Sequence, residues 1–214
     1  MTPPQPALSD TFRTVAEPCS DSMLVSGSKF IAWLAPLASE GDTESCMTER
    51  KRRYSDATHH CWAFRTGRPG PLVERSSDSG EPSGTAGRPI VDSLRRVELE
   101  NVICIVTRYF GGTKLGTGGL ARAYADAAAA AIATAHVVTR TVVQEIAIDF
   151  DHERTGPLFR VLDEFDVHLV PGVYDARGHG IVRIPASKVG AFRTRLSEFA
   201  RTGIDLTPNA LLIE

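Results

Sequence analysis

The sequence lacks any grouping of cysteines that would hold a metal ion or a disulfide framework. No two of its four cysteines form a C-x-x-C pair; they are Cys19, Cys46, Cys61 and Cys104. Zinc knuckles and small secreted folds depend on closely spaced or paired cysteines, so both classes are excluded. The pattern is typical of reduced thiols, and we expect a cytoplasmic protein with no metal site and no cofactor.

A surplus of charge of either sign is also absent. The chain has 24 Lys and Arg against 26 Asp and Glu, so its formal net charge is -2 and its pI is about 6.3. This balance excludes a globally basic nucleic-acid-binding protein. Residues 1–140 contain 16 basic and 15 acidic side chains, and the remaining residues contain 8 and 11. An anion site is therefore expected to be local and to lie in the first of these regions.

No hydrophobic run is long enough for a membrane span. The longest apolar stretch, Leu120–Val138, consists mostly of alanine and is interrupted by Arg122, Asp126 and His136. A spanning helix needs about 20 predominantly apolar residues, so a buried helix is expected here instead. The first residues have neither a basic n-region nor an apolar h-region, so we predict no signal peptide and no contact with a membrane.

Hydrophobic patterning predicts an α+β protein with two domains, residues 1–139 and 140–214. In the first domain we expect strands at Leu24–Val25, Phe30–Leu34, Thr58–Arg65 and Asn101–Tyr109, and helices at 39–53, at Ile90–Val97 and from the glycine-rich segment to about Ala135. The Thr58–Arg65 strand should carry Cys61 and Ala63 on one face and His60, Trp62 and Phe64 on the other. The stretch Thr66–Pro89 is so rich in glycine, proline and serine that we predict an irregular loop, functional or mobile.

The second domain has a recognisable order of elements. The predicted order is strand (Val138–Phe150), helix (Arg154–Phe165), strand (Val167–Tyr174), strand (Gly180–Pro185), helix (Ser187–Ala200) and strand (Ile204–Leu212). This βαββαβ order predicts a ferredoxin-like domain.

The most specific motif is the glycine-rich segment Arg108–Leu120, which joins a buried strand to the start of a helix. Free N–H groups at a helix start favour anions, and glycine lets a ligand approach the backbone. The backbone candidates are Gly111, Gly112, Gly116, Thr117 and Gly118. Arg108, Lys114 and Arg122 would contact phosphates, and Tyr109, Phe110 and Trp62 are candidates for base stacking. Alternatively, the glycines serve tight turns and close helix packing.

A second motif lies in the serine-rich loop Ser76–Pro89. In a functional interpretation, Ser83 and Thr85 donate hydrogen bonds, Asp78 and Glu81 act as metal ligands or acid/base groups, and Arg88 binds an anion. In the structural alternative, the serine and aspartate side chains bond to their own backbone in a turn. The sequence leaves both open.

Familiar catalytic patterns are missing. Neither a G-x-x-x-x-G-K-[ST] loop nor a dinucleotide-binding glycine pattern occurs, and no Ser/His/Asp triad can be argued from order or spacing. Neighbouring residues of a strand point to opposite faces, so His59, His60 and Cys61 cannot easily act together. We assign them a structural role and name no catalytic residue. The basic run Arg50–Arg53 is most simply explained as the solvated end of a helix.

Three segments together resemble the signature of the IMPACT/YigZ family: Ser77–Pro89, Arg108–Gly112 and Leu115–Leu120, with Asp56 and His59-His60-Cys61 before them. The resemblance implies a first domain built as a β-α sandwich similar to a ribosomal small-subunit protein domain, the GHMP kinases and domain IV of elongation factor G. It also implies a second domain similar to domain V of that factor. By analogy of fold, it implies a translation-related role.

We therefore expect a non-catalytic, translation-associated factor that binds RNA or the ribosome through the glycine-rich cleft. Two alternatives stay open. One is an enzyme that acts on a small phosphorylated or nucleotide substrate, with Asp78 or Glu81 as base or metal ligand. The other is an adaptor that binds a protein partner through the exposed sheet face of the second domain.

Overall fold

The computed structural model describes residues 9–172, 176–199 and 203–214. The chain divides into two compact units. One comprises Phe12–Thr139, and the other comprises the residues from Arg140 onward together with the segment before Phe12. Each unit has a sheet of its own, and five α-helices lie within the described residues. The chain is therefore a mixed α+β protein.

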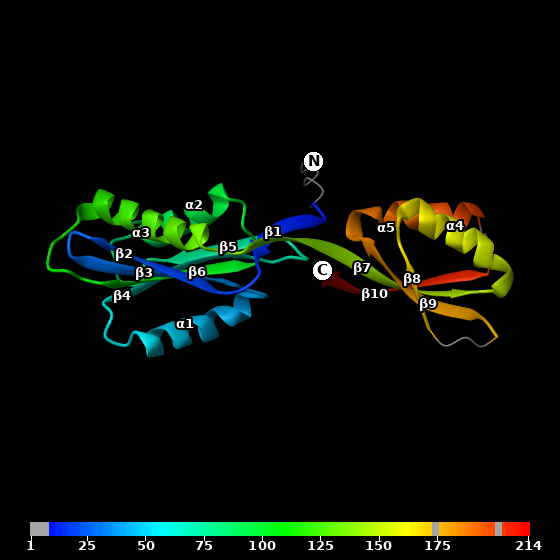
Figure 1. Ribbon diagram of the computed structural model, residues 1–214, viewed down its shortest axis with the longest axis horizontal. Coiled ribbons are helices and arrows are strands. Elements are labelled where there is room, and N and C mark those ends of the chain that lie inside the picture. Colours follow the sequence, from blue (N-terminus) through cyan, green and yellow to red (C-terminus); the bar gives the residue numbers. More distant parts are fainter. Residues whose placement is uncertain (1–8, 173–175, 200–202) are drawn as a thin grey trace. The chain divides into compact units, whose positions relative to one another are not determined.

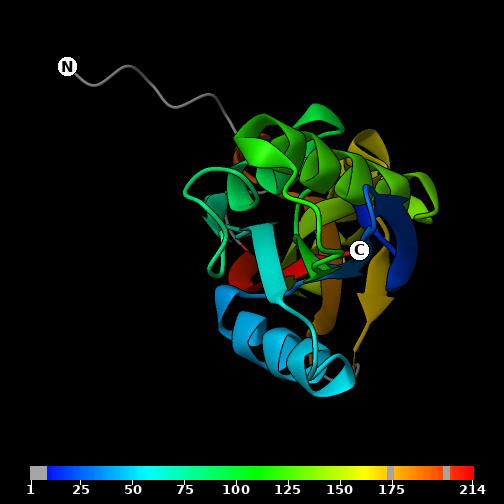
Figure 2. The same ribbon diagram turned by 90° about the vertical axis from the view of Figure 1, so that its left-hand side faces the viewer.

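The first unit is built on an antiparallel sheet with helices on both faces. Its strands are β2 (Cys19–Val25), β3 (Ser28–Pro36), β4 (His59–Thr66), β5 (Val73–Ser77) and β6 (Val102–Tyr109), in the order β2-β3-β6-β4-β5. Helices α2 (Gly87–Arg96) and α3 (Gly116–Ala133) cover one face, and a short 3-10 turn (Glu40–Asp42) leads into α1 (Thr43–Arg53) on the other. Figures 1 and 2 show the sheet between these two helical layers.

Strand β6 lies at the centre of the sheet because nearly all of its side chains are apolar. Residues Val102–Arg108 are all buried, as predicted for a strand packed on both faces. Cys104 and Val106 contact the α2–α3 layer, whereas Ile103 and Ile105 contact the α1 layer. The alternation therefore places the side chain of each β6 residue in one layer or the other.

The expected alternation along β4 is confirmed. Cys61 and Ala63 pack in the α2–α3 layer, and Trp62 and Phe64 lie in the α1 layer, where their rings stack with centroids 5.7 Å apart. His60 hydrogen-bonds Thr107 at 3.1 Å on that same side. His59 and His60 therefore lie on opposite faces of the sheet.

The prediction of an irregular loop over Thr66–Pro89 is wrong in part. Residues Val73–Ser77 form β5, which pairs antiparallel with β4, and α2 begins at Gly87 rather than at Ile90. Side-chain contacts also stabilise β5. The carboxylate of Glu74 accepts hydrogen bonds from Arg65 of β4, at 2.7 Å, and from Arg95 of α2. These partners are distant in sequence, so the local glycine and proline content gave no sign of them.

The second unit has the predicted βαββαβ order. Its elements are β7 (Val137–Phe150), α4 (Thr155–Phe165), β8 (Leu169–Pro171), β9 (Gly178–Pro185), α5 (Val189–Phe199) and β10 (Ile204–Ile213), with 3-10 turns at His152–Arg154 and Ala186–Lys188. The sheet order is β10-β7-β9-β8, and β1 (Thr11–Val15) also pairs with β7. Buried apolar residues such as Ile148, Leu162 and Phe192 form a separate core.

Parts of three predicted features lie outside the described residues. These are the interpretation of the first residues as lacking a signal peptide, the end of the strand predicted over Val167–Tyr174, and Ala200 of the helix predicted over Ser187–Ala200. The alanine-rich stretch forms α3, and no helix within the described ranges is long and apolar enough to cross a membrane.

A close backbone contact fixes the path of the chain after β6. A Cβ atom at Gly111 would lie only 1.9 Å from the carbonyl carbon of Gly27, which itself has φ +80. The N–H of Gly111 donates to Ser28 Oγ at 3.2 Å. The turn between β2 and β3 therefore lies directly against the loop that leads to α3, and only glycine fits at position 111.

We predict that Gly111→Ala lowers the free energy of unfolding by about 1–3 kcal/mol, because the added methyl group forces the two loops apart. Urea denaturation measures the change. Gly118→Ala is the matched control: its Cβ meets no atom within 4 Å, so it should be neutral or stabilising by up to about 1 kcal/mol. Equal midpoints for wild type and Gly111→Ala would contradict the contact.

Candidate functional site

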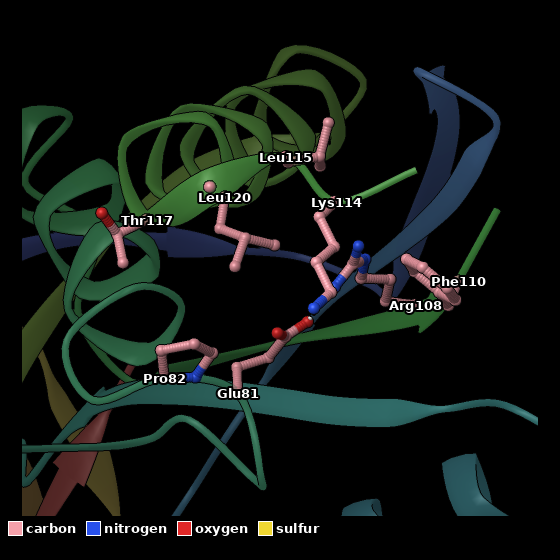
Figure 3. Close-up of a pocket in the computed structure, with 9 residues that line it drawn as sticks. Glu81, Pro82, Arg108, Phe110, Lys114, Leu115, Thr117 and Leu120 are labelled. Carbon is pink, nitrogen blue, oxygen red and sulfur yellow. Dashed lines mark hydrogen bonds and ion pairs between the residues drawn. The ribbon is translucent and has the colours of Figure 1, made fainter. Parts of the chain in front are cut away.

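A pocket of about 340 Å³ opens between the end of β6 and the start of α3. It is lined by Glu81, Pro82, Arg108, Phe110, Lys114, Leu115, Gly116, Thr117 and Leu120. Figure 3 shows Glu81 and Arg108 meeting beside Lys114, with Thr117 and Leu120 along the other wall. The pocket combines a few charged groups with an otherwise apolar lining, which is common in sites for small ligands or single nucleotide units.

Arg108 is the deepest cation of the pocket. It is the second-last residue of β6, and its side chain is only 6% exposed. One terminal nitrogen, Nη1, donates to Glu81 Oε1 at 2.6 Å, and Nη2 donates to Ser28 Oγ at 3.2 Å. Its Nε is buried and has no hydrogen-bond partner within the described residues. A buried donor without a partner is costly to the folded protein.

Glu81 holds Arg108 in place. Its Oε1 accepts from Arg108 and also from the hydroxyl of Tyr124 on α3, at 2.8 Å. The Nε2 atom of His59 lies 3.9 Å from the same oxygen. His59, Arg108 and Tyr124 lie on β4, β6 and α3, and Glu81 itself lies in the loop before α2. The carboxylate therefore connects four separate segments of the chain.

Cys61 extends this network as a neutral donor. Its thiol lies 3.3 Å from the Tyr124 hydroxyl and 3.0 Å from the backbone oxygen of Asp78. Burial raises the pKa of the Cys61 thiol to about 12, and burial likewise raises the pKa of Tyr124. Both groups are protonated at neutral pH, and the contacts of Cys61 fit the structural role expected of it.

The start of α3 supplies the second half of the pocket. Its cap residue, Leu115, makes no side-chain capping bond, so the N–H groups of the first turn have no side-chain partner there. Lys114 precedes this turn and is exposed. The charges of Arg108 and Glu81 offset one another, so Lys114 and the positive end of the helix leave the pocket with a net positive charge.

Asp78 has a structural role that follows from its contacts. Its Oδ1 accepts the N–H groups of Ala86 and Gly87, both at 2.9 Å, and its Oδ2 accepts that of Gly84 at 2.8 Å. Partial burial raises the pKa of Asp78, but these three donors outweigh it, so its pKa lies below the ordinary value. The carboxylate thus caps the start of α2. Within the described residues, no group of three or more His, Cys, Asp or Glu side chains could hold a metal ion.

Several of the predicted residues come together in the pocket, and others do not. Those that line it are Glu81, Arg108, Lys114, Gly116 and Thr117. The remaining predicted residues are absent from the lining: Asp78, Ser83, Thr85, Arg88, Tyr109, Gly111, Gly112, Gly118 and Arg122. Phe110, one of the stacking candidates, is 48% exposed and lies at the pocket.

The residues outside the pocket have other partners. Arg88 is exposed and lies 3.7 Å from Asp92, one helical turn further along α2. The hydroxyl of Thr85 donates to the backbone of Pro82 at 2.6 Å, and Tyr109 donates to Asp56 at 2.8 Å on the α1 side of the sheet. For Asp78 and Thr85, the structural alternative therefore accounts for their contacts.

Sequence reasoning missed two members of the site, Ser28 and Tyr124. Ser28 accepts from both Arg108 and Gly111 although it is 80 residues away in sequence. Tyr124 is the one aromatic residue of α3 and stands among alanines, which is a signal that was available. A buried hydroxyl in an alanine-rich helix needs a polar partner, and that partner is Glu81.

Comparison with known proteins shows which family the chain belongs to. The family model described as the Impact N-terminal domain matches residues 26–132, which is half of the chain and contains the whole pocket. A relative from Thermus thermophilus, an IMPACT family member in the pol 5' region, is 43% identical over 186 residues, 86% of this chain and 87% of that protein. The chain belongs to the IMPACT family.

A further IMPACT relative and one solved structure match most of the chain. The IMPACT family member YigZ of Escherichia coli (strain K12) is 30% identical over 180 residues, which cover 84% of this chain and 88% of that protein. A crystal structure described as that of a hypothetical protein has a TM-score of 0.65 and 27% identity, and covers 93% of this chain and 97% of that one. The likeness to the IMPACT/YigZ signature is therefore confirmed.

We predict that Asp78→Ala lowers the free energy of unfolding by about 2 kcal/mol at pH 7, because three backbone N–H groups lose their acceptor. The folded-state pKa of Asp78 is depressed, so its contribution is complete above the ordinary aspartate pKa of about 3.9 and is lost as the pH falls through the folded-state value. Urea denaturation at pH 7 and in steps down to about pH 3 measures both effects.

Asp126→Ala is the control for this prediction, since Asp126 is an exposed carboxylate on α3. Its substitution should change stability little at any pH. If the difference between wild type and Asp78→Ala stayed constant with pH, the capping role of the carboxylate would be wrong.

Proposed function

We propose that the first unit binds RNA through the pocket at the end of β6, and that the protein acts in translation. The observation that carries the proposal is the guanidinium of Arg108, which is almost fully buried and lines the pocket. Arginine nitrogens in a desolvated position bind phosphate oxygens strongly. The first turn of α3 and Lys114 add further positive potential to the same space.

The ring of Phe110 at the pocket favours a ligand that contains a nucleotide base over a free phosphate. Phe110 is half exposed, and the guanidinium of Arg108 lies 5.6 Å from its ring centroid. Single-stranded RNA is bound through such pairs, in which a base stacks on an exposed ring while a cation holds the adjacent phosphate. The overall charge of -2 is compatible with this arrangement because the positive groups are concentrated at one site.

The translation part of the proposal rests on the family resemblance. The IMPACT/YigZ family resembles elongation factor G in the fold of domains IV and V, and its first domain resembles a ribosomal small-subunit protein domain. The ribosome is therefore the RNA-containing partner that we propose first. Analogy of fold carries no site chemistry, so the pocket supplies that part of the argument.

The size of the pocket favours a second candidate, an enzyme that acts on a small phosphorylated or nucleotide substrate. A volume of about 340 Å³ lies at the lower end of the range for small-molecule sites. Glu81 would then be the base. Its Oε1 already accepts from both Arg108 and Tyr124, however, so this oxygen is engaged in holding the arginine and the tyrosine in place.

A third candidate is a protein partner on the open sheet face of the second unit. Val170 and Ile181 are exposed and directly paired across β8 and β9. Beside them, His179 contacts Asp149 and Arg183 pairs with Glu145, so charged pairs border the apolar area. Small apolar areas of this kind are common on soluble proteins, which makes this candidate weaker than the pocket.

We predict that Lys114→Ala weakens binding to ribosomes and to a labelled single-stranded RNA, and lowers the salt slope of RNA binding by about 0.7, the value for one phosphate contact. Co-sedimentation with ribosomes and fluorescence anisotropy with the RNA, each at several salt concentrations, measure this. Arg88→Ala removes one exposed charge outside the pocket and is the matched control, which should bind as the wild type does.

Two results would count against this function. Absence of RNA and ribosome binding at low salt by the folded wild type would remove it and leave the small-substrate candidate. Equal losses in Lys114→Ala and Arg88→Ala would show that general surface charge, and not the pocket, attracts the RNA. A screen of phosphorylated metabolites for turnover, with Glu81→Gln as the inactive variant, would then test the enzyme.

A further inference from the structure

A second cationic surface lies on the other side of the same strand end. We define the α1-side surface as Lys29, Lys51, Arg53 and Tyr109. Lys29 of β3 is paired with Tyr109 of β6, and strand alternation puts both on the face that α1 covers. Figure 2 shows α1 on the side of the sheet opposite to α2 and α3.

The last turn of α1 brings Lys51 and Arg53 to this end of the sheet. Lys51 lines a hollow together with Trp62 of β4 and Ser77 of β5. Burial lowers the pKa of His60, and the charge of Lys51 lowers it further. His60 in turn bonds to Thr107, two residues before Tyr109. The connection from α1 to β4 therefore lies at the same end of the sheet as the loop after β6, the left-hand end in Figure 1.

The cations of the α1-side surface are not neutralised by ion pairs. Lys29, Lys51 and Arg53 are all exposed, and none forms an ion pair within the described part of the chain. Seven of the twelve arginines in this unit are paired with carboxylates: Arg50, Arg65, Arg68, Arg75, Arg88, Arg95 and Arg108. Asp56 accepts from Tyr109 at this surface, and the carboxylates of Glu40 and Glu44 line the same hollow as Lys51.

The basic run at the end of α1 is thus not uniform. Arg50 is buried, lies 4.6 Å from the ring of Trp33 and bonds to Glu49, so it stabilises the packing of α1 on the sheet. Lys51 and Arg53 remain available to a ligand. Their exposure agrees with the expected solvated end of a helix.

The pocket and the α1-side surface flank a single point, the end of β6. Arg108 and Tyr109 are neighbours in that strand, so one side chain enters the pocket and the other lies on the opposite face. Phe110 follows them and is exposed. A ligand long enough to cross the strand end would contact cations on both faces and an aromatic ring between them.

We propose that the bound RNA is a single strand that crosses the end of β6, with one phosphate in the pocket and the following phosphates on the α1-side surface. This rests on the proposed function and extends it from one nucleotide unit to several. Alternating cations and exposed rings are the arrangement with which proteins follow a flexible single strand, whose bases are free to stack. A free mononucleotide would reach the pocket alone.

The test compares two ligands, uridine monophosphate and a single-stranded RNA of about ten nucleotides, within the site sizes known for such proteins. The variant Lys29→Ala/Lys51→Ala/Arg53→Ala should bind the mononucleotide as the wild type does. For the oligomer, its salt slope should fall by about 2, close to 0.7 for each cation removed, which is about a 100-fold loss at 0.1 M salt relative to 1 M. Isothermal titration calorimetry and fluorescence anisotropy measure the two ligands.

The variant Arg96→Ala/Lys188→Ala/Arg193→Ala is the matched control, because it removes three exposed, unpaired cations that lie outside both surfaces. It should bind both ligands as the wild type does. Urea denaturation checks that all variants are folded, and the three single variants replace the triple one if it is not.

The outcomes separate this inference from the proposed function. If the α1-side variant binds the oligomer as tightly as the control does while Lys114→Ala does not, the inference is wrong and the pocket stands. If the α1-side variant loses the oligomer while Lys114→Ala binds both ligands normally, the surface is supported and the pocket is not the RNA site. If the wild type binds no oligomer at low salt, both ideas fail.

Discussion

The buried ion pair between Arg108 and Glu81 is the constraint on which the rest of the first unit depends. A guanidinium that is almost fully removed from water is stable only if its charge and its donors are matched. Glu81 supplies the charge and Ser28 a further acceptor, and Tyr124 fixes the carboxylate from α3. Removing one partner would leave the other charge buried and alone, which costs several kcal/mol in comparable cases, of order 3–5.

The ion pair also fixes the orientation of Arg108 in the wall of the pocket. Two of the Arg108 nitrogens donate to Glu81 and Ser28, and the third, Nε, is buried without a hydrogen-bond partner among the described residues. The guanidinium is thereby oriented before any ligand arrives, so little conformational entropy is lost on binding. The glycines of the following loop then let the chain pass close to the β2–β3 turn and start α3 beside the arginine. The site is thus a consequence of how the end of β6 is packed.

The sequence was informative where the signal was local. The apolar run of β6, the alternation along β4 and the glycine-rich start of α3 could all be predicted, because each depends on neighbouring residues. Strand β5 could not, since its stability comes from pairing with β4 and from Arg95 of α2. For the same reason, the candidate roles of Arg88 and Asp78 could not be separated from that of Arg108. All three side chains are suited to ligand binding, and only the folded chain shows that Arg108 lines the pocket whereas Arg88 and Asp78 do not.

The central claim is that the pocket lined by Arg108 binds a phosphate group of RNA. The most direct measurement is a ¹H–¹⁵N spectrum of the arginine Nε–H groups of the full chain, recorded during titration with a short single-stranded RNA. We predict that the Arg108 signal shifts strongly, while those of Arg65 and Arg95, whose Nε–H groups already donate to Glu74, stay in place. An unchanged Arg108 signal in RNA-saturated protein would contradict the claim.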